Sequence, residues 1–254
     1  MFIVPSGARR VVAKFVKLLK LLSYKQYRRF LFGWGVAAAV EHSAIVRVVR
    51  PMTLIDVGAN IGQFSLVAHA EAPGLQIFAF EPHAQSAGVY RGAFSTFPRV
   101  HLLETAVGAC AGTATLHVSG KSDSSSLLEI SDEQVAYAPG TQRVADQAVC
   151  VTSIDLALKD FAIQSPCLLK IDVQGGELDV LRGSIQMFRK IDFIYCELSF
   201  REFYIGQPFA SEVIDFLRKF GFTISAVHNL AYGVDGVAVQ ADFLFKRGEV
   251  TSVS

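Results

Sequence analysis

Two carboxylates flanking a glycine-rich stretch are the first residues whose types and spacing suggest chemistry. Asp56 ends an apolar run of strand length, and Gly58, Asn60 and Gly62 follow it within IDVGANIG. Glycine adopts positive φ at little cost and lets a ligand approach the backbone, so this stretch predicts a tight ligand-binding turn before a helix. Glu81 ends the next apolar run, 25 residues after Asp56. A carboxylate at that place can accept hydrogen bonds from both hydroxyls of a ribose.

The spacing of the glycines distinguishes between two classes of nucleotide ligand. The dinucleotide fingerprint needs glycine at the third and sixth positions, where this chain has Asn60 and Gln63, counted from Gly58. The pattern Asp-x-Gly-x-Asn-x-Gly is instead typical of a turn that binds S-adenosylmethionine, which has no pyrophosphate. Asp56 can hold the ammonium group of this cofactor directly or through water. A purely structural alternative is that Asp56 caps the turn and Glu81 merely ends a strand.

Two further carboxylates end later apolar runs and are candidates for catalysis. Asp172 ends LLKID, and Glu197 ends FIYCE. Transfer of a group from a bound cofactor to a protonated acceptor is assisted by a general base within hydrogen-bond reach. We expect Asp172 to be this base, and Glu197 to be a second base or to orient the acceptor. The structural alternatives are a cap on the turn after Asp172 and an ion pair between Glu197 and Arg201.

Smaller signals lie beside these carboxylates. Ala106 and Val107 follow the third apolar run, where small apolar side chains can flank an adenine. Lys170 lies two residues before Asp172, so its side chain shares that face of the strand and can pair with a carboxylate. The serines of SDSSS, residues 122–126, either line a ligand pocket or form an ordinary polar loop. Because no pair of aspartates follows the fourth main strand, we predict no metal site.

Short apolar runs alternate with longer amphipathic segments after Pro51 and must position these side chains. The expected strands are residues 53–57, 75–81, 100–103, 167–172, 193–197, 222–227 and 242–245. The expected helices are residues 63–70, 84–94, 178–188 and 211–220. This alternation predicts an α/β fold with a doubly wound, mainly parallel sheet and helices on both faces. Ligands of such sheets bind at the carboxyl ends of the central strands, where the four carboxylates lie.

Four segments that occur in order across about 130 residues support a more specific interpretation. They are IDVGANIG, FAFEP, ETAVG with the later SSSL, and LLKIDVQGGELDVLRG. With these segments the chain resembles the FkbM family of S-adenosylmethionine-dependent methyltransferases, although Gln174 stands where many relatives have Glu. The resemblance implies a Rossmann-like seven-stranded sheet with an antiparallel last strand. It also implies O-methylation of a hydroxyl on a sugar, glycolipid or natural-product acceptor.

Charge is distributed unevenly along the chain, although 24 Lys and Arg nearly balance 23 Asp and Glu. Residues 1–50 carry a net charge of +9, which leaves −8 on the remaining 204 residues. An acidic main domain lacks the basic surface that phosphate contacts require, so we expect no nucleic-acid partner. We therefore divide the chain into a basic helical extension (1–50), a methyltransferase domain (51–248) and a flexible tail (249–254).

The periodicity of residues 8–32 is that of a basic amphipathic helix. Its apolar stripe can lie in a membrane interface with its cations toward anionic lipid, or it can pack on the main domain. A third alternative is a cleaved signal, because Arg28 and Arg29 precede the apolar run 30–40. Eleven helical residues span about 16 Å, less than the ~30 Å hydrocarbon core, which excludes a membrane span.

The four cysteines are widely separated in the sequence. Cys110, Cys150, Cys167 and Cys196 lack metal-ligand spacing, and we predict buried free thiols in a reducing compartment. The expected location is the cytoplasm, at the inner face of the membrane if the helix binds lipid. Two other functions stay open: a non-catalytic cofactor-binding module of the same fold, and an N-methyltransferase. The chain lacks the Pro-Pro-aromatic signature of an N-methyltransferase after the fourth main strand.

Overall fold

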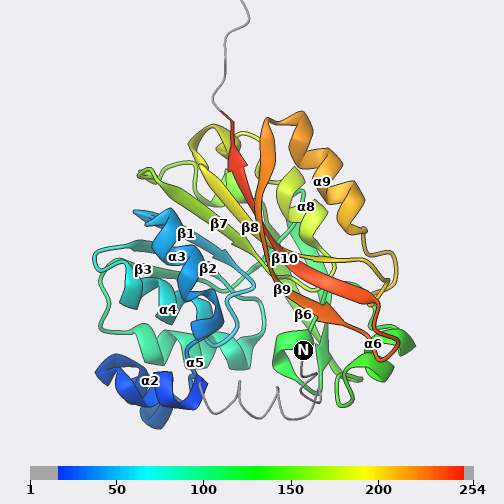
Figure 1. Cartoon of the computed structure of the whole chain (residues 1–254), viewed down its shortest axis with the longest axis horizontal. Coiled ribbons are helices and arrows are strands. Elements are labelled where there is room, and N and C mark those ends of the chain that lie inside the picture. Colours follow the sequence, from blue (N-terminus) through cyan, green and yellow to red (C-terminus); the bar gives the residue numbers. More distant parts are fainter. Residues whose placement is uncertain (1–16, 249–254) are drawn as a thin grey trace, which may run out of the picture.

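A seven-stranded sheet forms the centre of the computed structural model, which describes residues 17–248 (Figure 1). Its strands are β1 (Thr53–Val57), β2 (Gln76–Phe80), β3 (Val100–Leu103), β7 (Cys167–Ile171), β8 (Phe193–Ser199), β9 (Phe222–Tyr232) and β10 (Ala238–Arg247). Their spatial order is β3-β2-β1-β7-β8-β10-β9. The first five run parallel, whereas β10 is antiparallel to both β8 and β9. The predicted mainly parallel sheet with an antiparallel last strand is confirmed.

The central strands β1 and β7 are buried along their whole length. Near-continuous apolar sequence is typical of parallel strands that are covered on both faces. Side chains alternate between those faces, since Leu54 packs in one hydrophobic cluster and Ile55 in the other. This packing fixes the register of β1 and so the point where Asp56 and the following turn emerge.

Helices form the two outer layers (Figure 1). The first cluster packs under α3 (Ser43–Val49), α4 (Gln63–Glu71) and α5 (Ala84–Phe94). The second packs under α7 (Ile154–Ala157), α8 (Glu177–Arg182), η3 (Met187–Lys190) and α9 (Ala210–Lys219). The predicted helix over 178–188 therefore ends earlier, at Arg182, and resumes as a short 3-10 turn.

A second, three-stranded sheet lies between β3 and β7 in the sequence and was not predicted. Its order is β4-β6-β5, with β4 (Ala106–Val107), β5 (Gly112–Ser119) and β6 (Arg143–Thr152). The 3-10 helix η2 (Ser122–Ser124) and the helix α6 (Asp132–Tyr137) connect β5 to β6. Most residues of β5 and β6 are exposed or half-buried, so these strands lack the apolar runs that mark the main sheet.

The predicted helix over 8–32 is interrupted by a bend at Tyr24. Residues 17–23 are helical, and α2 (Lys25–Trp34) follows the bend. The start of the predicted helix, 8–16, and the predicted tail, 249–254, lie outside the described residues. No helix within residues 17–248 is long and apolar enough to cross a membrane.

The apolar side of α2 packs on the main domain. Phe30 is fully buried, and its ring contacts Phe94 of α5 edge-on with the centroids 5.0 Å apart. The Trp34 ring lies so close to α5 that a Cβ on Gly92 would stand 2.3 Å from it. The chain then passes through η1 (Val40–His42) into α3. Of the two arrangements that the sequence left open, packing on the domain accounts for these buried side chains.

Candidate active site

The glycine-rich turn after β1 packs directly on the end of β7. Gly58 has a φ of +76°, and a Cβ built on it would lie 1.8 Å from the carbonyl oxygen of Asp172. Gly62, the N-cap of α4, has a φ of +94°, and its Cβ would lie 2.4 Å from the ring of Phe94. Both conformations favour glycine, and the close approaches leave no room for a side chain. The predicted turn therefore joins the carboxyl ends of two neighbouring strands.

Glu81 is held at the end of β2 by the backbone of this turn. The backbone N–H of Asn60 donates to its Oε2 at 2.7 Å, and that of His83 donates to its Oε1 at 2.8 Å. Burial raises the pKa of Glu81 to about 7, although both N–H groups favour the charged form. Each carboxylate oxygen keeps a further lone pair, so Glu81 can accept additional hydrogen bonds from a ligand.

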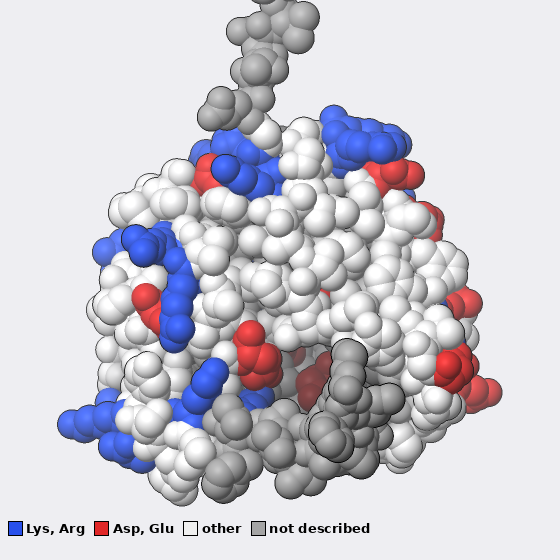
Figure 2. All heavy atoms as spheres, in the orientation of Figure 1, with Lys and Arg blue, Asp and Glu red and all other residues white. Residues whose placement is uncertain are grey.

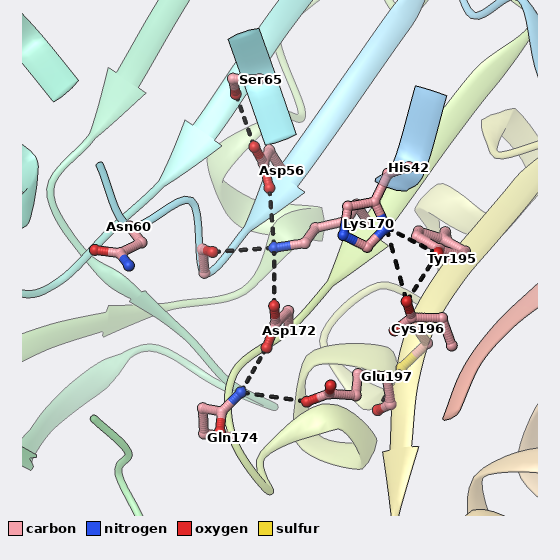
Figure 3. A network of polar contacts seen from close by, with 12 residues as sticks. His42, Asp56, Asn60, Ser65, Lys170, Asp172, Gln174, Tyr195, Cys196 and Glu197 are labelled. Atoms are coloured by element: carbon pink, nitrogen blue, oxygen red, sulfur yellow. Dashed lines mark hydrogen bonds and ion pairs between the residues drawn. The ribbon is translucent and has the colours of Figure 1, made fainter. Parts of the chain in front are cut away.

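Lys170 connects the two aspartates at the centre of the site (Figure 3). Its Nζ lies 3.4 Å from Asp56 Oδ1 and 3.5 Å from Asp172 Oδ2, and it donates to the carbonyl oxygen of Gly58 at 3.1 Å. Burial lowers the pKa of Lys170, but the two carboxylates raise it above its ordinary value, so the ammonium stays charged. The predicted pairing of Lys170 with a carboxylate thus involves two carboxylates.

Asp56 is fully buried beneath the turn. Its Oδ2 accepts a hydrogen bond from the Ser65 hydroxyl at 2.7 Å, and its Oδ1 faces Lys170. This carboxylate does not belong to the lining of the cavity described below. Asp56 therefore acts on the cavity through Lys170, which does line it.

Gln174 bridges the two candidate catalytic carboxylates (Figure 3). Its Nε2 donates to Asp172 Oδ1 at 2.6 Å and lies 3.4 Å from Glu197 Oε2, while the Tyr204 hydroxyl donates to its Oε1 at 2.8 Å. The backbone of Gln174 is left-handed, with a φ of +59°, which is uncommon for a residue other than glycine. Burial, followed by the charge of Asp172, raises the pKa of Glu197 well above its ordinary value.

Glu197 and Asp172 therefore have different electrostatic roles. Burial favours the neutral form of Glu197 by raising its pKa, and both its oxygens face amide donors, Gln240 Nε2 at 2.8 Å and Gln174 Nε2 at 3.4 Å. The side chain of Asp172 is 40% exposed and is paired with Lys170. The alternative ion pair of Glu197 is not formed: Arg201 contacts Glu133 and Asp235 instead.

A cavity of about 240 Å³ extends along the carboxyl ends of β2, β1 and β7. Five of the predicted cofactor-binding residues line it: Gly58, Asn60, Glu81, Ala106 and Val107. On the side of β2, Glu81 is accompanied by the apolar side chains of Val107 and Leu116. On the side of β7 the lining is mixed, with the charged Lys170 and Asp172, the ring of His42, and the apolar Ala39 and Phe64.

A second cavity, of about 330 Å³, adjoins the first at three residues that line both, Asp123, Asp172 and Gln174. Its other walls come from α6 and the loop after it, from α8, from β8 and the loop after it, and from β10. They include Gln134, Thr141, Glu177, Glu197, Ser199, Phe203, Tyr204, Gln207 and Gln240. Figure 2 shows a hollow near the centre of the lower half of this face, with acidic side chains at its rim and inside it.

The serine-rich loop, residues 122–126, lines both cavities. Of the two alternatives for this loop, a pocket lining and an ordinary polar loop, the structure shows the first. Ser122, Ser125 and Ser126 line the first cavity, and Ser124 lines the second. The Ser126 hydroxyl donates to the backbone oxygen of Gln174 at 2.6 Å. These serines are therefore part of the site and not an isolated polar loop.

Two expectations about individual residues need correction or extension. Cys167 and Cys196 are buried as predicted, but Cys110 and Cys150 are exposed because they lie in and beside the second sheet, which has little core of its own. His42 was not singled out from the sequence, since no motif surrounds it and only the packing of η1 brings it to the cavity. Among residues 17–248, no group of His, Cys, Asp and Glu is arranged to hold a metal ion.

The first cavity fits S-adenosylmethionine by the chemistry of its lining. One buried carboxylate, Glu81, has free lone pairs beside the apolar side chains of Val107 and Leu116, as a nucleoside needs. At the other end, polar side chains provide an environment for an amino acid group.

Comparison with known proteins agrees with this assignment. The model of the methyltransferase FkbM domain matches residues 56–224. The 2-O-methyltransferase NoeI of Sinorhizobium fredii (strain NBRC 101917 / NGR234) is 26% identical over 237 residues, which cover 89% of this chain and 96% of NoeI. The 31-O-demethyl-FK506 methyltransferase FkbM of Streptomyces tacrolimicus is 29% identical over 206 residues, covering 70% and 75%.

A third relative is the hexuronic acid methyltransferase AglP of Haloferax volcanii, 30% identical over 148 residues that cover 57% of this chain and 55% of AglP. The domain match extends over most of the main sheet and includes Asp56, Glu81, Asp172 and Glu197. The chain belongs to the FkbM family of methyltransferases, enzymes that use S-adenosylmethionine as cofactor.

Proposed function

We propose that the enzyme methylates a hydroxyl oxygen on a sugar or a sugar-bearing acceptor. The observation that carries this proposal is the position of Asp172, which lines both cavities at their junction. A cofactor in the first cavity and an acceptor in the second would meet beside this carboxylate. That arrangement suits an in-line transfer, in which positioning supplies much of the rate.

The cofactor-binding residues are Glu81 for the ribose hydroxyls, and Ala106 and Val107 beside the adenine. The backbone at Gly58 and Asn60 faces the sulfonium and amino acid part. The bound cofactor supplies a methyl group made electrophilic by a positively charged sulfur. Gly62 and Asp56 position this lining from behind, through the start of α4 and through Lys170.

Asp172 accepts the proton of the acceptor hydroxyl as general base. Its Oδ1 is hydrogen-bonded to Gln174 and its Oδ2 faces Lys170, so the carboxylate is held in a fixed orientation. Glu197 accepts hydrogen bonds from Gln240 and Gln174, and its remaining lone pairs can orient a second hydroxyl of the same acceptor. The two carboxyl groups thus divide the roles of base and orienting group.

The second cavity suits an acceptor with many hydroxyl groups. Amide side chains of Gln134, Gln207 and Gln240 can each donate and accept, and the aromatic rings of Phe203 and Tyr204 provide flat apolar surface. Named relatives act as a 2-O-methyltransferase and as a hexuronic acid methyltransferase, which supports a sugar acceptor. The named substrate of a third relative, 31-O-demethyl-FK506, makes other natural products the next class to screen.

The test is a screen with methyl-labelled S-adenosylmethionine against panels of glycosides, other natural products and amines, using the wild-type protein and Asp172→Asn. We expect label in a base-stable ether on a glycoside, and a loss of about 10²- to 10⁴-fold in kcat for Asp172→Asn with unchanged cofactor affinity. Transfer to amines alone would favour the N-methyltransferase. Tight cofactor binding without transfer to any panel would favour the non-catalytic module.

We also propose that the enzyme is cytoplasmic and contacts the membrane surface through residues 17–34. Leu19, before the bend, and Phe32 of α2 have exposed side chains. Lys and Arg side chains gather at the lower left of Figure 2, where Figure 1 places α2. Such a surface suits anionic lipid. In vesicle sedimentation, Leu19→Glu with Phe32→Glu should abolish binding to phosphatidylglycerol vesicles, whereas Val234→Glu on an exposed turn should not. Equal binding by both variants would refute the contact.

A further inference from the structure

A chain of three hydrogen-bonded side chains connects the sheet to the first cavity (Figure 3). Asp242 of β10 accepts a hydrogen bond from the Tyr195 hydroxyl of β8 at 2.9 Å and one from Asn229 Nδ2 at 2.6 Å. Tyr195 in turn lies 2.9 Å from Nδ1 of His42, in η1. Because a tyrosine has only one hydroxyl proton and Tyr195 gives it to Asp242, His42 Nδ1 must be the donor in the last contact.

This assignment determines the state of the other ring nitrogen of His42. With the proton on Nδ1, a neutral imidazole carries a lone pair on Nε2. Burial lowers the pKa of His42, although the Asp242 carboxylate opposes this, and the ring is neutral near pH 7. Within residues 17–248, Nε2 has no hydrogen-bond partner. Figure 3 shows it turned away from Tyr195 toward Lys170, and His42 lines the first cavity.

The position of Glu81 indicates which part of the cofactor lies near His42. Glu81 ends β2, and the apolar side chains of Val107 and Leu116 line the cavity on that side. In S-adenosylmethionine the adenine and the amino acid group extend from opposite sides of the ribose. An adenosine held at Glu81 therefore directs the amino acid group across β1 toward β7, where His42 closes the cavity.

Two of the charged groups at that end, Lys170 and Asp56, are engaged with each other, while the half-exposed Asp172 is the alternative acceptor that the test below separates from His42. The three N–H groups of Lys170 face three oxygens, those of Gly58, Asp56 and Asp172. Asp56 is fully buried behind it and cannot reach a ligand. An α-ammonium group in this part of the cavity needs a hydrogen-bond acceptor, and the predicted acceptor, Asp56, is not accessible.

We propose that His42 Nε2 accepts a hydrogen bond from the α-ammonium of S-adenosylmethionine, and that Tyr195 and Asp242 are positioning residues that fix its tautomer. The N-terminal segment then supplies a cofactor-binding side chain to a domain whose other contacts follow from its motifs. The inference depends on cofactor binding alone and is independent of the acceptor.

The test is calorimetric titration at pH 8 with two ligands, S-adenosylhomocysteine and 5′-deoxy-5′-methylthioadenosine, which lacks the amino acid group. His42→Phe should weaken binding of S-adenosylhomocysteine about tenfold, the typical effect of one hydrogen bond to a charged group. Binding of methylthioadenosine should change less than about twofold. His42→Gln, whose carbonyl oxygen can replace the acceptor, should recover part of the affinity.

Tyr195→Phe is the second variant, since it retains the ring but releases the tautomer of His42. We expect a loss of about threefold with S-adenosylhomocysteine and none with methylthioadenosine. An equal loss with both ligands in His42→Phe would assign His42 a structural role. An unchanged affinity for S-adenosylhomocysteine, with a loss in Asp172→Asn instead, would assign the ammonium to Asp172. Either result overturns the proposal. The first leaves the proposed O-methylation untouched, and the second changes only the role given to Asp172, because the screen measures transfer of label separately.

Discussion

The two cavities that meet at Asp172 are built in different ways. The first takes its carboxylates Glu81 and Asp172 and its glycine-rich turn from short motifs that directly follow β2, β7 and β1, and other segments complete its lining. The second is assembled from α6, α8, β8, the loop after β8 and β10, which are far apart in the sequence. The motifs of the first cavity can therefore be recognised in short stretches of sequence, whereas the second cavity depends on how distant segments pack.

We expect the strongest effect from a substitution at Gly58, which packs against Asp172, a residue that lines both cavities. Gly58→Ala would place a Cβ 1.8 Å from the Asp172 backbone at a φ of +76°, so the turn and the end of β7 must move apart. We expect loss of S-adenosylhomocysteine binding by more than about 100-fold and destabilisation by about 3 kcal/mol, measured by calorimetry and thermal unfolding.

A matched control for this change is Gly206→Ala. Gly206 has a similar φ of +80°, but its Cβ would meet no atom within 4 Å. We expect only the backbone strain of about 1 kcal/mol and unchanged cofactor binding. If the two variants lose equal stability, the close approach of β1 and β7 is not what makes Gly58 necessary.

The next prediction concerns the dependence of cofactor binding on pH. Each cavity contains one glutamate whose pKa burial raises to about 7: Glu81 lines the first cavity and Glu177 lines the second. The ribose hydroxyls donate to the ionised form of Glu81, so affinity for S-adenosylhomocysteine should be full above pH 7 and fall as the pH drops below it. Glu81→Gln should weaken binding about tenfold at pH 8 and remove this pH dependence.

Glu177→Gln is the counterpart, with the same neutralisation in the other cavity. Its carboxylate accepts the Gly175 N–H at 2.9 Å and does not line the first cavity. Calorimetry should find wild-type affinity and a wild-type pH profile. A profile that flattens in Glu177→Gln would mean that the cavities are electrostatically coupled.

A smaller effect is expected from Gln174→Glu. A third carboxylate beside Asp172 and Glu197 would favour their protonated forms, since its side chain replaces a donor at 2.6 Å. The acid limb of the pH–rate profile should move upward by about one pH unit while cofactor affinity stays constant. An unchanged profile would exclude a direct influence of residue 174 on the base.

The smallest effect is expected from Tyr204→Phe, which removes the hydrogen bond to Gln174 Oε1 at 2.8 Å. Its loss should cost about 1 kcal/mol in kcat/KM for the acceptor, about fivefold, without changing the affinity for the cofactor. Steady-state kinetics with the acceptor found in the screen measures it. A cofactor affinity that falls in parallel would show that Gln174 serves the first cavity as well.

The elements and residues that could be predicted from the sequence are those with strong local signals. The bounds predicted for β1, β3 and α5 are those of the structure, because strong apolar patterns and local turns fix them. β5 and β6 were missed, since strands with little buried surface carry few apolar residues. Glu81 and Asp172 could be found from their motifs, but the place of His42 depends on the packing of η1 on the sheet.

The close packing of Trp34 on Gly92 has a practical consequence. Trp34 is the single tryptophan of the chain and lies at the junction of α2 and α5. Its intrinsic fluorescence therefore reports on one place only, the attachment of α2 to the main domain. A shift of its emission to longer wavelength on adding vesicles would reveal, without any label, that lipid draws this helix away from the enzyme.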